Sequence, residues 1–334
     1  MKNTLTTLLL LLSFVSFSQK LSYKVIKDEP DKIKKFTVHL DPFFVDAWST
    51  NSTLGFGARA DLLFLKRFSG NLTFRKAYLD MNARTHADAS LAKPKNGFSK
   101  MTYIEPSVAF HLRDRLKKRD VKVVLSSNTT YSGNYQTTHT KYIMVPGTVR
   151  RITAARGGLF FVNTAIDMDE GDAIKTWTAT NGNEKVSFGD FGTTIHGSSV
   201  YNGYTQMRQV TLFGGLSFKS ITNLKAEVEG YSKPRGNYNF YDFYVDYMFA
   251  PVLNFQDVKF ADGTKFTLSN STTKRTGWRV GMLWKNANRA YLSYGFEFGQ
   301  RPGYEGNDKG FLNSRSFLNL VMGVSIPYDL KILK

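Results

Sequence analysis

A histidine and a serine lie two residues apart in the segment IHGSSVYNG, residues 195–203. If this segment is a strand, alternate residues share a face, so His196 and Ser198 lie on the same side. An imidazole beside a serine hydroxyl can accept its proton and make the oxygen a nucleophile toward an ester. Catalysis by this pair is one interpretation, and a polar loop or strand entrance is the other.

Four carboxylates gather in the segment DMDEGD, at Asp167, Asp169, Glu170 and Asp172. Closely spaced carboxylates with a glycine suit a hard cation such as Ca²⁺, although the full twelve-residue loop with its distal glutamate is missing. A solvated acidic loop tip is the alternative. The five histidines have no metal-ligand spacing. We therefore expect no cofactor, with Ca²⁺ as the one candidate.

A dense basic run, RDRLKKRD, occupies residues 113–120. We interpret it as a turn that contacts anionic lipids or an acidic partner subunit. The alternative is a solvated turn with charges that prevent aggregation.

The elements that must position these residues are strands. In TLGFGARADLLFL, residues 53–65, the side chains of Leu54, Phe56 and Ala58 fall on one face, while Arg59 and Asp61 fall on the other. This is the period of two that a β-strand requires. The same alternation recurs along the chain without a convincing amphipathic helix. The sequence therefore predicts an all-β fold.

The ends and the composition indicate an exported protein. Residues 1–18 have a lysine, an apolar run too short to span a membrane as a helix, and small residues before a cleavage point, which is typical of a signal peptide. Residues 19–35 are a polar arm, expected in the periplasm. The chain has no cysteine, and its net charge is +18. An exported basic protein meets no genome, so we expect no nucleic acid as a partner. Anionic lipid head groups, acidic glycans and anionic solutes remain as candidates.

The number of strands is expected to be about fourteen, with twelve or sixteen as alternatives. The candidate segments are 36–48, 53–65, 71–80, 100–112, 121–131, 140–150, 157–167, 201–219, 223–232, 239–249, 252–260, 276–285, 290–300 and 315–327. Short and long connections between them alternate, which favours an antiparallel up-and-down β-barrel with short turns on the periplasmic side.

The apolar side of these strands is predicted to face lipid. Many segments run about 10 to 13 residues, whereas globular strands average roughly 5–6 and bilayer-crossing strands need about 9–11. Trp278 and Trp284 share a face and are separated by roughly 15 Å along the membrane normal, so they approach both edges of an apolar band. The opposite face would then line a lumen, with Arg59, Asp61, Glu105, Lys225, Glu227, Asp242, Asp246, Arg279 and Glu297.

On these features the chain resembles the porin-like outer-membrane β-barrels of Gram-negative bacteria, over residues 36–334. The resemblance implies an integral protein of the bacterial outer membrane after signal-peptide cleavage, in contact with outer-membrane lipids and lipopolysaccharide. In size it is similar to the long-chain fatty-acid transporters. The His196–Ser198 pair is similar to the His-x-Ser pair of outer-membrane acyl hydrolases, where Asn-Gly follows the serine directly; here Ser199 and Val200 follow.

The leading functional hypothesis is a non-enzymatic barrel, either a narrow channel or a structural subunit of an envelope complex for secretion or assembly. Mixed charge signs on the lumen face argue against a strongly selective ring. A lipid acyl hydrolase that uses His196 and Ser198 is one alternative, and a transporter of hydrophobic solutes is another.

Overall fold

The computed structural model describes residues 21–48, 51–63, 67–80, 100–133, 135–167, 176–179, 185–187, 194–195, 198–199, 204–259, 265–269, 273–305 and 313–329. Every regular element in these ranges is a β-strand. In the same ranges no helix is long and apolar enough to cross a membrane. The all-β fold class predicted from alternation is therefore confirmed.

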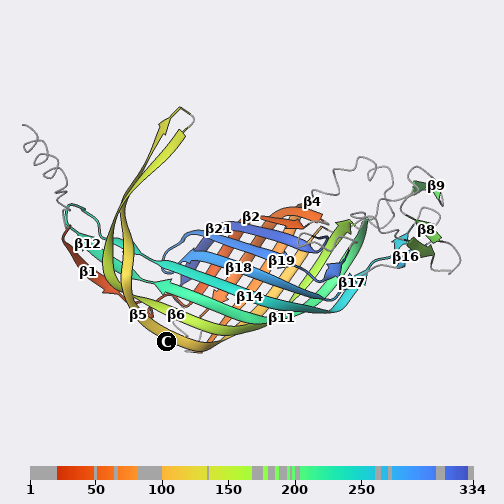
Figure 1. Ribbon diagram of the computed structural model, residues 1–334, viewed down its shortest axis with the longest axis horizontal. Helices are drawn as coiled ribbons and strands as arrows, with labels where there is room; N and C mark the ends of the chain where they lie inside the picture. The colour runs from red at the N-terminus through yellow and green to blue at the C-terminus, as the bar shows by residue number, and fades with distance from the viewer. Residues whose placement is uncertain are drawn as a thin grey trace, which may run out of the picture. The chain divides into compact units, whose positions relative to one another are not determined.

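Ten antiparallel strands form one large sheet, whose neighbours lie side by side in Figure 1. They are β2 (Phe36–Trp48), β3 (Asn51–Leu62), β4 (Phe68–Asp80), β5 (Thr102–Ser132), β6 (Tyr135–Asp167), β11 (Tyr204–Thr222), β14 (Asn239–Phe255), β18 (Thr276–Asn286), β19 (Tyr291–Gln300) and β21 (Ser316–Tyr328). The pairing order is β11-β14-β18-β19-β21-β2-β3-β4-β5-β6. Strand β11 pairs with both β14 and β6, so the order of pairing returns to its start.

Within the described residues, this sheet has fewer strands than the fourteen, twelve or sixteen expected. The difference arises because several expected segments join into one strand or belong to another sheet. Residues 121–131 belong to β5, residues 140–150 and 157–167 are both part of β6, and residues 252–255 continue β14. Residues 224–228 form β12, which belongs to a different sheet. The polar stretches 113–120 and 151–156 are predicted as turns, but strand pairing uses the backbone and continues through them.

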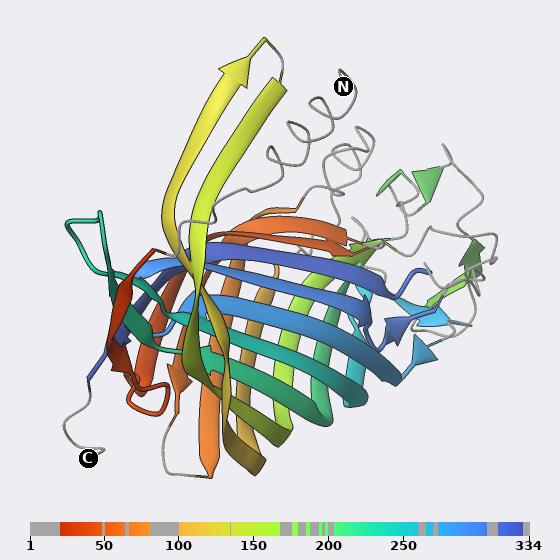
Figure 2. The same ribbon diagram turned by 60° about the vertical axis from the view of Figure 1, so that its left-hand side comes forward.

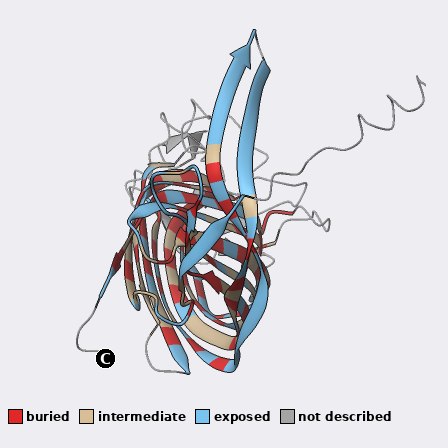
Figure 3. Ribbon diagram, turned by 90° about the vertical axis from the view of Figure 1, so that its left-hand side faces the viewer, coloured by how far each residue is buried: buried red, intermediate tan, exposed pale blue. Residues whose placement is uncertain are grey.

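Burial in the large sheet is inverted relative to a water-soluble protein. Along β14 the side chains of Phe243, Val245 and Phe249 are exposed, whereas Asp246 on the opposite face is buried. On β21 the exposed residues are Leu318, Leu320, Met322 and Val324, while Asn319 and Ser325 are buried. Buried and exposed bands therefore alternate along the strands, as Figure 3 shows. The enclosed face, which we call the inner face, holds most of the charge.

A second compact unit comprises residues 118–147 and 224–237 together with the described residues 21–28. The unit contains a three-stranded sheet of β1 (Tyr23–Asp28), β12 (Leu224–Val228) and β13 (Arg235–Asn237), so the N-terminal arm includes a strand. Its core includes Val123, Val145, Leu224 and Ala226. Gly147 lies against Leu224 and Val121 so closely that a Cβ atom would collide with Leu224.

Within this unit, residues 118–147 of strands β5 and β6 form a two-stranded ribbon (Figure 2). Strand β5 pairs with β4 only between Thr102 and Phe110, and β6 pairs with β11 only from Val149 to Asp167. Thr129 lies opposite Thr138 with their hydroxyl oxygens 3.2 Å apart, which fixes the register of the ribbon. Its tip is exposed, with Tyr135 80% accessible. The basic run at residues 113–120 is therefore part of a strand and not a turn.

The remaining strands are short. One sheet contains β7 (Thr176–Ala179), β8 (Lys185–Ser187), β15 (Val258–Lys259) and β16 (Lys265–Ser269). Two further pairs are β9 (Thr194–Ile195) with β10 (Ser198–Ser199), and β17 (Thr273–Lys274) with β20 (Gly303–Tyr304).

Candidate functional site

The inner face changes character from one end of the large sheet to the other. We define the near end as the end where β2 begins and β21 finishes, because Phe36 pairs there with both Tyr328 and Leu62. The inward positions of β14, read from the near end, are Phe240, Asp242, Tyr244, Asp246 and Met248. Polar residues thus occupy the middle of the strand, with apolar residues on either side.

Arg279 of β18 is the centre of a buried ion network. Its guanidinium group donates two hydrogen bonds of 2.7 Å to the two carboxylate oxygens of Glu105, and its Nε donates a third of 2.7 Å to Asp246. Only 2% of its side chain is accessible. A paired, two-pronged arrangement of this kind is the strongest form of side-chain ion pair in proteins. The network thus holds a charge that burial alone would exclude.

A second arginine and two aromatic hydroxyl groups complete this network. Arg75 donates to Glu297 at 3.2 Å, and the Tyr244 hydroxyl donates to the other oxygen of Glu297 at 2.5 Å. The Tyr103 hydroxyl donates to Glu105. Arg156 lies 3.4 Å from both Glu105 and Asp246, and its guanidinium carbon is 4.0 Å from the centre of the Tyr244 ring.

Three of these ion pairs join strands that lie far apart in the pairing order. Arg279 on β18 reaches Glu105 on β5, and Arg75 on β4 reaches Glu297 on β19. Closer to the end where β2 begins, Lys285 on β18 donates a hydrogen bond of 2.6 Å to Asp61 on β3. Each pair is four strands apart in the order around the sheet. The side chains therefore cross the enclosed space and do not only line its wall.

The Asp61 carboxylate is the centre of a second polar group. It contacts His39 Nε2 at 2.7 Å and accepts a hydrogen bond from Asn71 at 2.5 Å, while Arg59 Nε lies 3.4 Å away. Between the neighbouring strands β11 and β14, Lys219 donates to Asp242 at 2.6 Å, and within β11 it donates to Ser217 at 2.9 Å. The charged side chains of Asp61, Lys219 and Asp242 therefore form ion pairs within the inner face, as those around Arg279 do.

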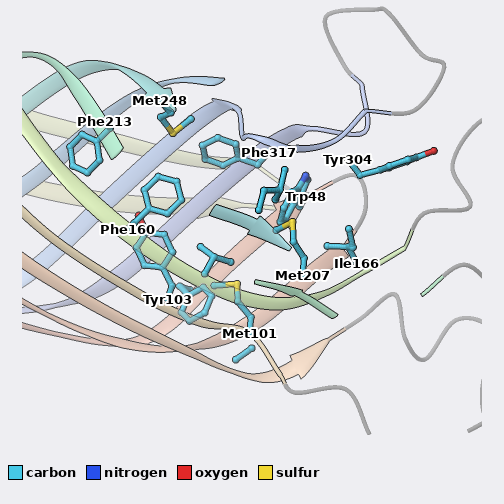
Figure 4. Close-up of a cluster of buried hydrophobic side chains, with 14 of the residues drawn as sticks. Trp48, Met101, Tyr103, Phe160, Ile166, Met207, Phe213, Met248, Tyr304 and Phe317 are labelled. Carbon is cyan, nitrogen blue, oxygen red and sulfur yellow. The ribbon is translucent and has the colours of Figure 1, made fainter. Parts of the chain in front are cut away.

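The end opposite the near end is filled by apolar side chains (Figure 4). The buried cluster is Phe44, Trp48, Ala77, Met101, Tyr103, Phe160, Val162, Ile166, Met207, Phe213, Met248, Leu253, Tyr304, Phe317 and Val321. It adjoins the ion network, because the Arg279 guanidinium carbon is 4.4 Å from the Phe213 ring centre. The indole of Trp48 donates to the Ser314 carbonyl oxygen at 3.0 Å.

Charged residues also form ion pairs near the turn that precedes β21. Arg301 contacts Asp46 at 2.7 Å, and its guanidinium carbon is 4.0 Å from the Phe317 ring centre. Arg315 lies 3.3 Å from Glu305. Burial lowers the pKa of Arg315, and the Glu305 carboxylate opposes that shift. Arg315 also donates to the Thr276 carbonyl oxygen at 2.9 Å, which connects this turn to β18.

A cavity occupies the near half of the inner face. Its empty volume is about 1040 Å³, including the part that opens to solvent. Ile33, Leu63 and Ala287, which lie in the connections at the near end, form its mouth, and Arg75, Glu105 and Glu297 of the ion network form its floor. Arg75, Glu105 and Glu297 therefore belong both to the ion network and to the lining of this cavity.

The structure brings together seven of the nine residues predicted to share the lumen face. They lie on the inner face or in its cavity: Arg59, Asp61, Glu105, Asp242, Asp246, Arg279 and Glu297. Lys225 and Glu227 lie on β12, in the three-stranded sheet, and are not part of this set. Their alternation with Leu224 and Ala226 correctly predicts a strand, but alternation does not say which sheet a strand joins.

Sequence reasoning missed several members of the two networks. Arg75 alternates with the exposed Leu72 and Phe74 and could have been assigned by the same period-two rule. Arg156 was harder to assign to the inner face, because apolar and polar residues alternate poorly around it. Tyr103 was missed as well. His39 was considered only as a metal ligand, whereas it is held between Arg59 and Asp61.

The other candidate sites lie mainly outside the described residues. His196, Asp169, Glu170 and Asp172 are not described. Ser198 lies on β10 and Asp167 ends β6, but their side chains are likewise undescribed. In the described part of the chain, no group of three or more histidine or carboxylate side chains could hold a metal ion. The hydrolase and Ca²⁺ interpretations therefore stay predictions.

Comparison with known proteins gives no assignment. No protein-family model matches the chain, and no curated protein matches its sequence. The function of the chain is therefore inferred from its geometry.

Proposed function

We propose that this protein is an integral outer-membrane β-barrel of the porin-like class that acts as a structural subunit of an envelope complex and not as an open channel. The observation that carries the proposal is the set of ion pairs that cross the enclosed space, Arg279–Glu105, Arg75–Glu297 and Lys285–Asp61. A conducting pore needs a continuous aqueous path, and these pairs and the apolar cluster both lie within the space that such a path would have to cross.

The membrane location is supported by the inverted burial. Exposed side chains such as Val245, Leu320 and Met322 would contact water in a soluble protein, at a cost of roughly 25 cal/mol for each Å² of apolar surface. Lipid removes that cost, and pairing between neighbouring strands supplies the backbone hydrogen bonds that lipid cannot. The signal peptide expected over residues 1–18 agrees with export.

The ribbon of β5 and β6 supports the subunit role. With a periplasmic N-terminus, the short connections at the near end face the periplasm. Both strands pass this end, because Phe110 pairs with Phe68 and Val149 pairs with Thr222. In the ribbon that follows, exposed strand edges can accept a strand from a partner. We propose that another envelope subunit docks on this ribbon.

Fractionation and gentle extraction test this proposal. The full chain, expressed with its signal peptide in a Gram-negative host, should stay in the outer-membrane pellet after carbonate washing. It should also migrate faster unheated than boiled on a denaturing gel, because a closed hydrogen-bonded barrel resists unfolding. Extraction from its native membrane in mild detergent should yield a complex with a defined stoichiometry. Release by salt alone would contradict the membrane location, and recovery only as a monomer would contradict the subunit role.

A further inference from the structure

The cavity at the near end combines polar and apolar lining in the way that a ligand site does. Its lining combines charged side chains such as Lys219 and Lys285 with apolar ones such as Phe240 and Leu63. All of its lining residues belong to the unit that contains the large sheet.

The charge that lines the cavity is positive on balance. Its basic residues are Lys34, Lys35, Arg59, Arg75, Arg156, Lys219 and Lys285, and its acidic residues are Asp61, Glu105, Asp242 and Glu297. Seven positive groups against four negative ones leave an excess of three. A cavity with low-dielectric walls concentrates such an excess, which attracts anions.

Two lysines have hydrogen-bonding capacity for a ligand. An ammonium group carries three N–H donors. Among the described residues, Lys285 donates to Asp61, and Lys219 donates to Asp242 and Ser217. Arg59, Lys219 and Lys285 all line the same cavity. An anionic oxygen that reaches both lysines would accept hydrogen bonds from their remaining N–H groups. It would also reduce the electrostatic repulsion between the two ammonium groups.

The mouth of the cavity is apolar. Phe240 and Ala287 pack with Ile152 and Ile221 at the near end, and Ile33 and Leu63 pack against that group. Phe240 also lies 4.6 Å from the Lys285 ammonium group, measured to the ring centre. A ligand whose charged group reaches Lys285 would therefore place its next carbon atoms against Phe240 and Leu63.

We propose that this cavity binds a small amphiphilic anion, with an acidic head group between Lys219 and Lys285 and a short apolar chain along Phe240 and Leu63. Carboxylates and phosphate monoesters share the required head-group chemistry. The site is a further activity beyond the structural role, and it does not depend on that role.

Equilibrium binding to the purified full chain in non-ionic detergent tests the site, with octanoate and octyl phosphate as the two anionic probes. Octanol serves as the uncharged analogue and acetate as the analogue without a chain. We expect saturable binding of one octanoate or octyl phosphate per chain and at least tenfold weaker binding of octanol and acetate. Binding of only one anionic probe would identify its head group as the natural one. Octanol binding as tightly as octanoate would overturn the proposal.

Variants locate the site. Asp61→Asn with Lys285→Met removes one positive and one negative group together and should weaken octanoate binding at least tenfold, as should Lys219→Met with Asp242→Asn. Arg289→Met, at an exposed arginine absent from the cavity lining, should leave binding unchanged. The faster migration of unheated samples reports that each variant is folded. Unchanged octanoate affinity in a folded double variant would overturn the site. If neither double variant folds, the difference in affinity between octanoate and octanol for the unmodified chain decides whether the proposal holds.

Discussion

At the scale of single residues, Arg279 is the most consequential side chain of the inner face. It is the common partner of Glu105 and Asp246 and lies 3.6 Å from Glu297. Replacement by methionine leaves three buried carboxylates without their shared cation. Breaking a buried ion pair in this way typically costs about 3–5 kcal/mol. We expect Arg279→Met to lower the free energy of unfolding in lipid vesicles by that amount, measured by urea titration of tryptophan fluorescence.

The matched control for this prediction is Arg289→Met. Arg289 is an exposed arginine in the connection between β18 and β19, where it contacts Tyr238. Exposed substitutions of this kind usually change stability by less than about 0.5 kcal/mol. Equal effects of the two substitutions would mean that the network around Arg279 is not what stabilises the enclosed space.

At the scale of the strand, the outward face of β14 tests the medium that surrounds the sheet. Val245 is 41% accessible and pairs with Leu216 and Val280. In water, an exposed valine tolerates arginine with little change. In lipid, arginine near the bilayer midplane costs about 2–4 kcal/mol. We expect Val245→Arg to lower the free energy of unfolding in vesicles by that amount, while Val245→Leu leaves it nearly unchanged. A neutral Val245→Arg would place this face in water.

The ribbon of β5 and β6 gives a second prediction at this scale. Ser127 and Thr129 lie opposite Thr140 and Thr138, so Leu125 and Tyr142 lie opposite each other. Residues 126–141 can then be replaced by Asn-Gly, which favours the two-residue turn of a hairpin. We expect the shortened protein to keep its heat-dependent migration, because most of the removed side chains are exposed. Partner recovery in mild detergent should fall by at least tenfold.

Two outcomes of the shortening would change the interpretation. Loss of the fast-migrating form would mean that the ribbon is required for the fold. Full recovery of a partner by the shortened protein would place the docking surface elsewhere on the chain.

At the scale of the whole molecule, the enclosed space should not conduct ions. The crossing ion pairs and the apolar cluster around Phe160 and Phe317 lie one after the other along it. We expect purified protein in planar bilayers to give no steady current steps in 1 M KCl. Reproducible steps from the unmodified chain would contradict the closed interior, and a porin reconstituted in parallel confirms that the assay detects conduction.

Much of this architecture is determined by the sequence itself. Period-two alternation defines which residues form strands and which face each residue takes, because successive side chains of a strand point to opposite sides. That rule by itself places Arg59, Asp246 and Arg279 on one face. It also identifies the outward apolar residues of β14 and β21.

Only the tertiary structure decided which of these residues meet. Glu105 and Arg279 are separated by 174 residues and lie on strands that do not pair, so their contact depends on how the sheet curls and on the stagger of its strands. The same holds for the assignment of Lys225 and Glu227 to another sheet, and for the fusion of predicted segments into β5 and β6. Local alternation fixes the direction of a side chain, but the partner across an enclosed space is set by the closure of the whole sheet.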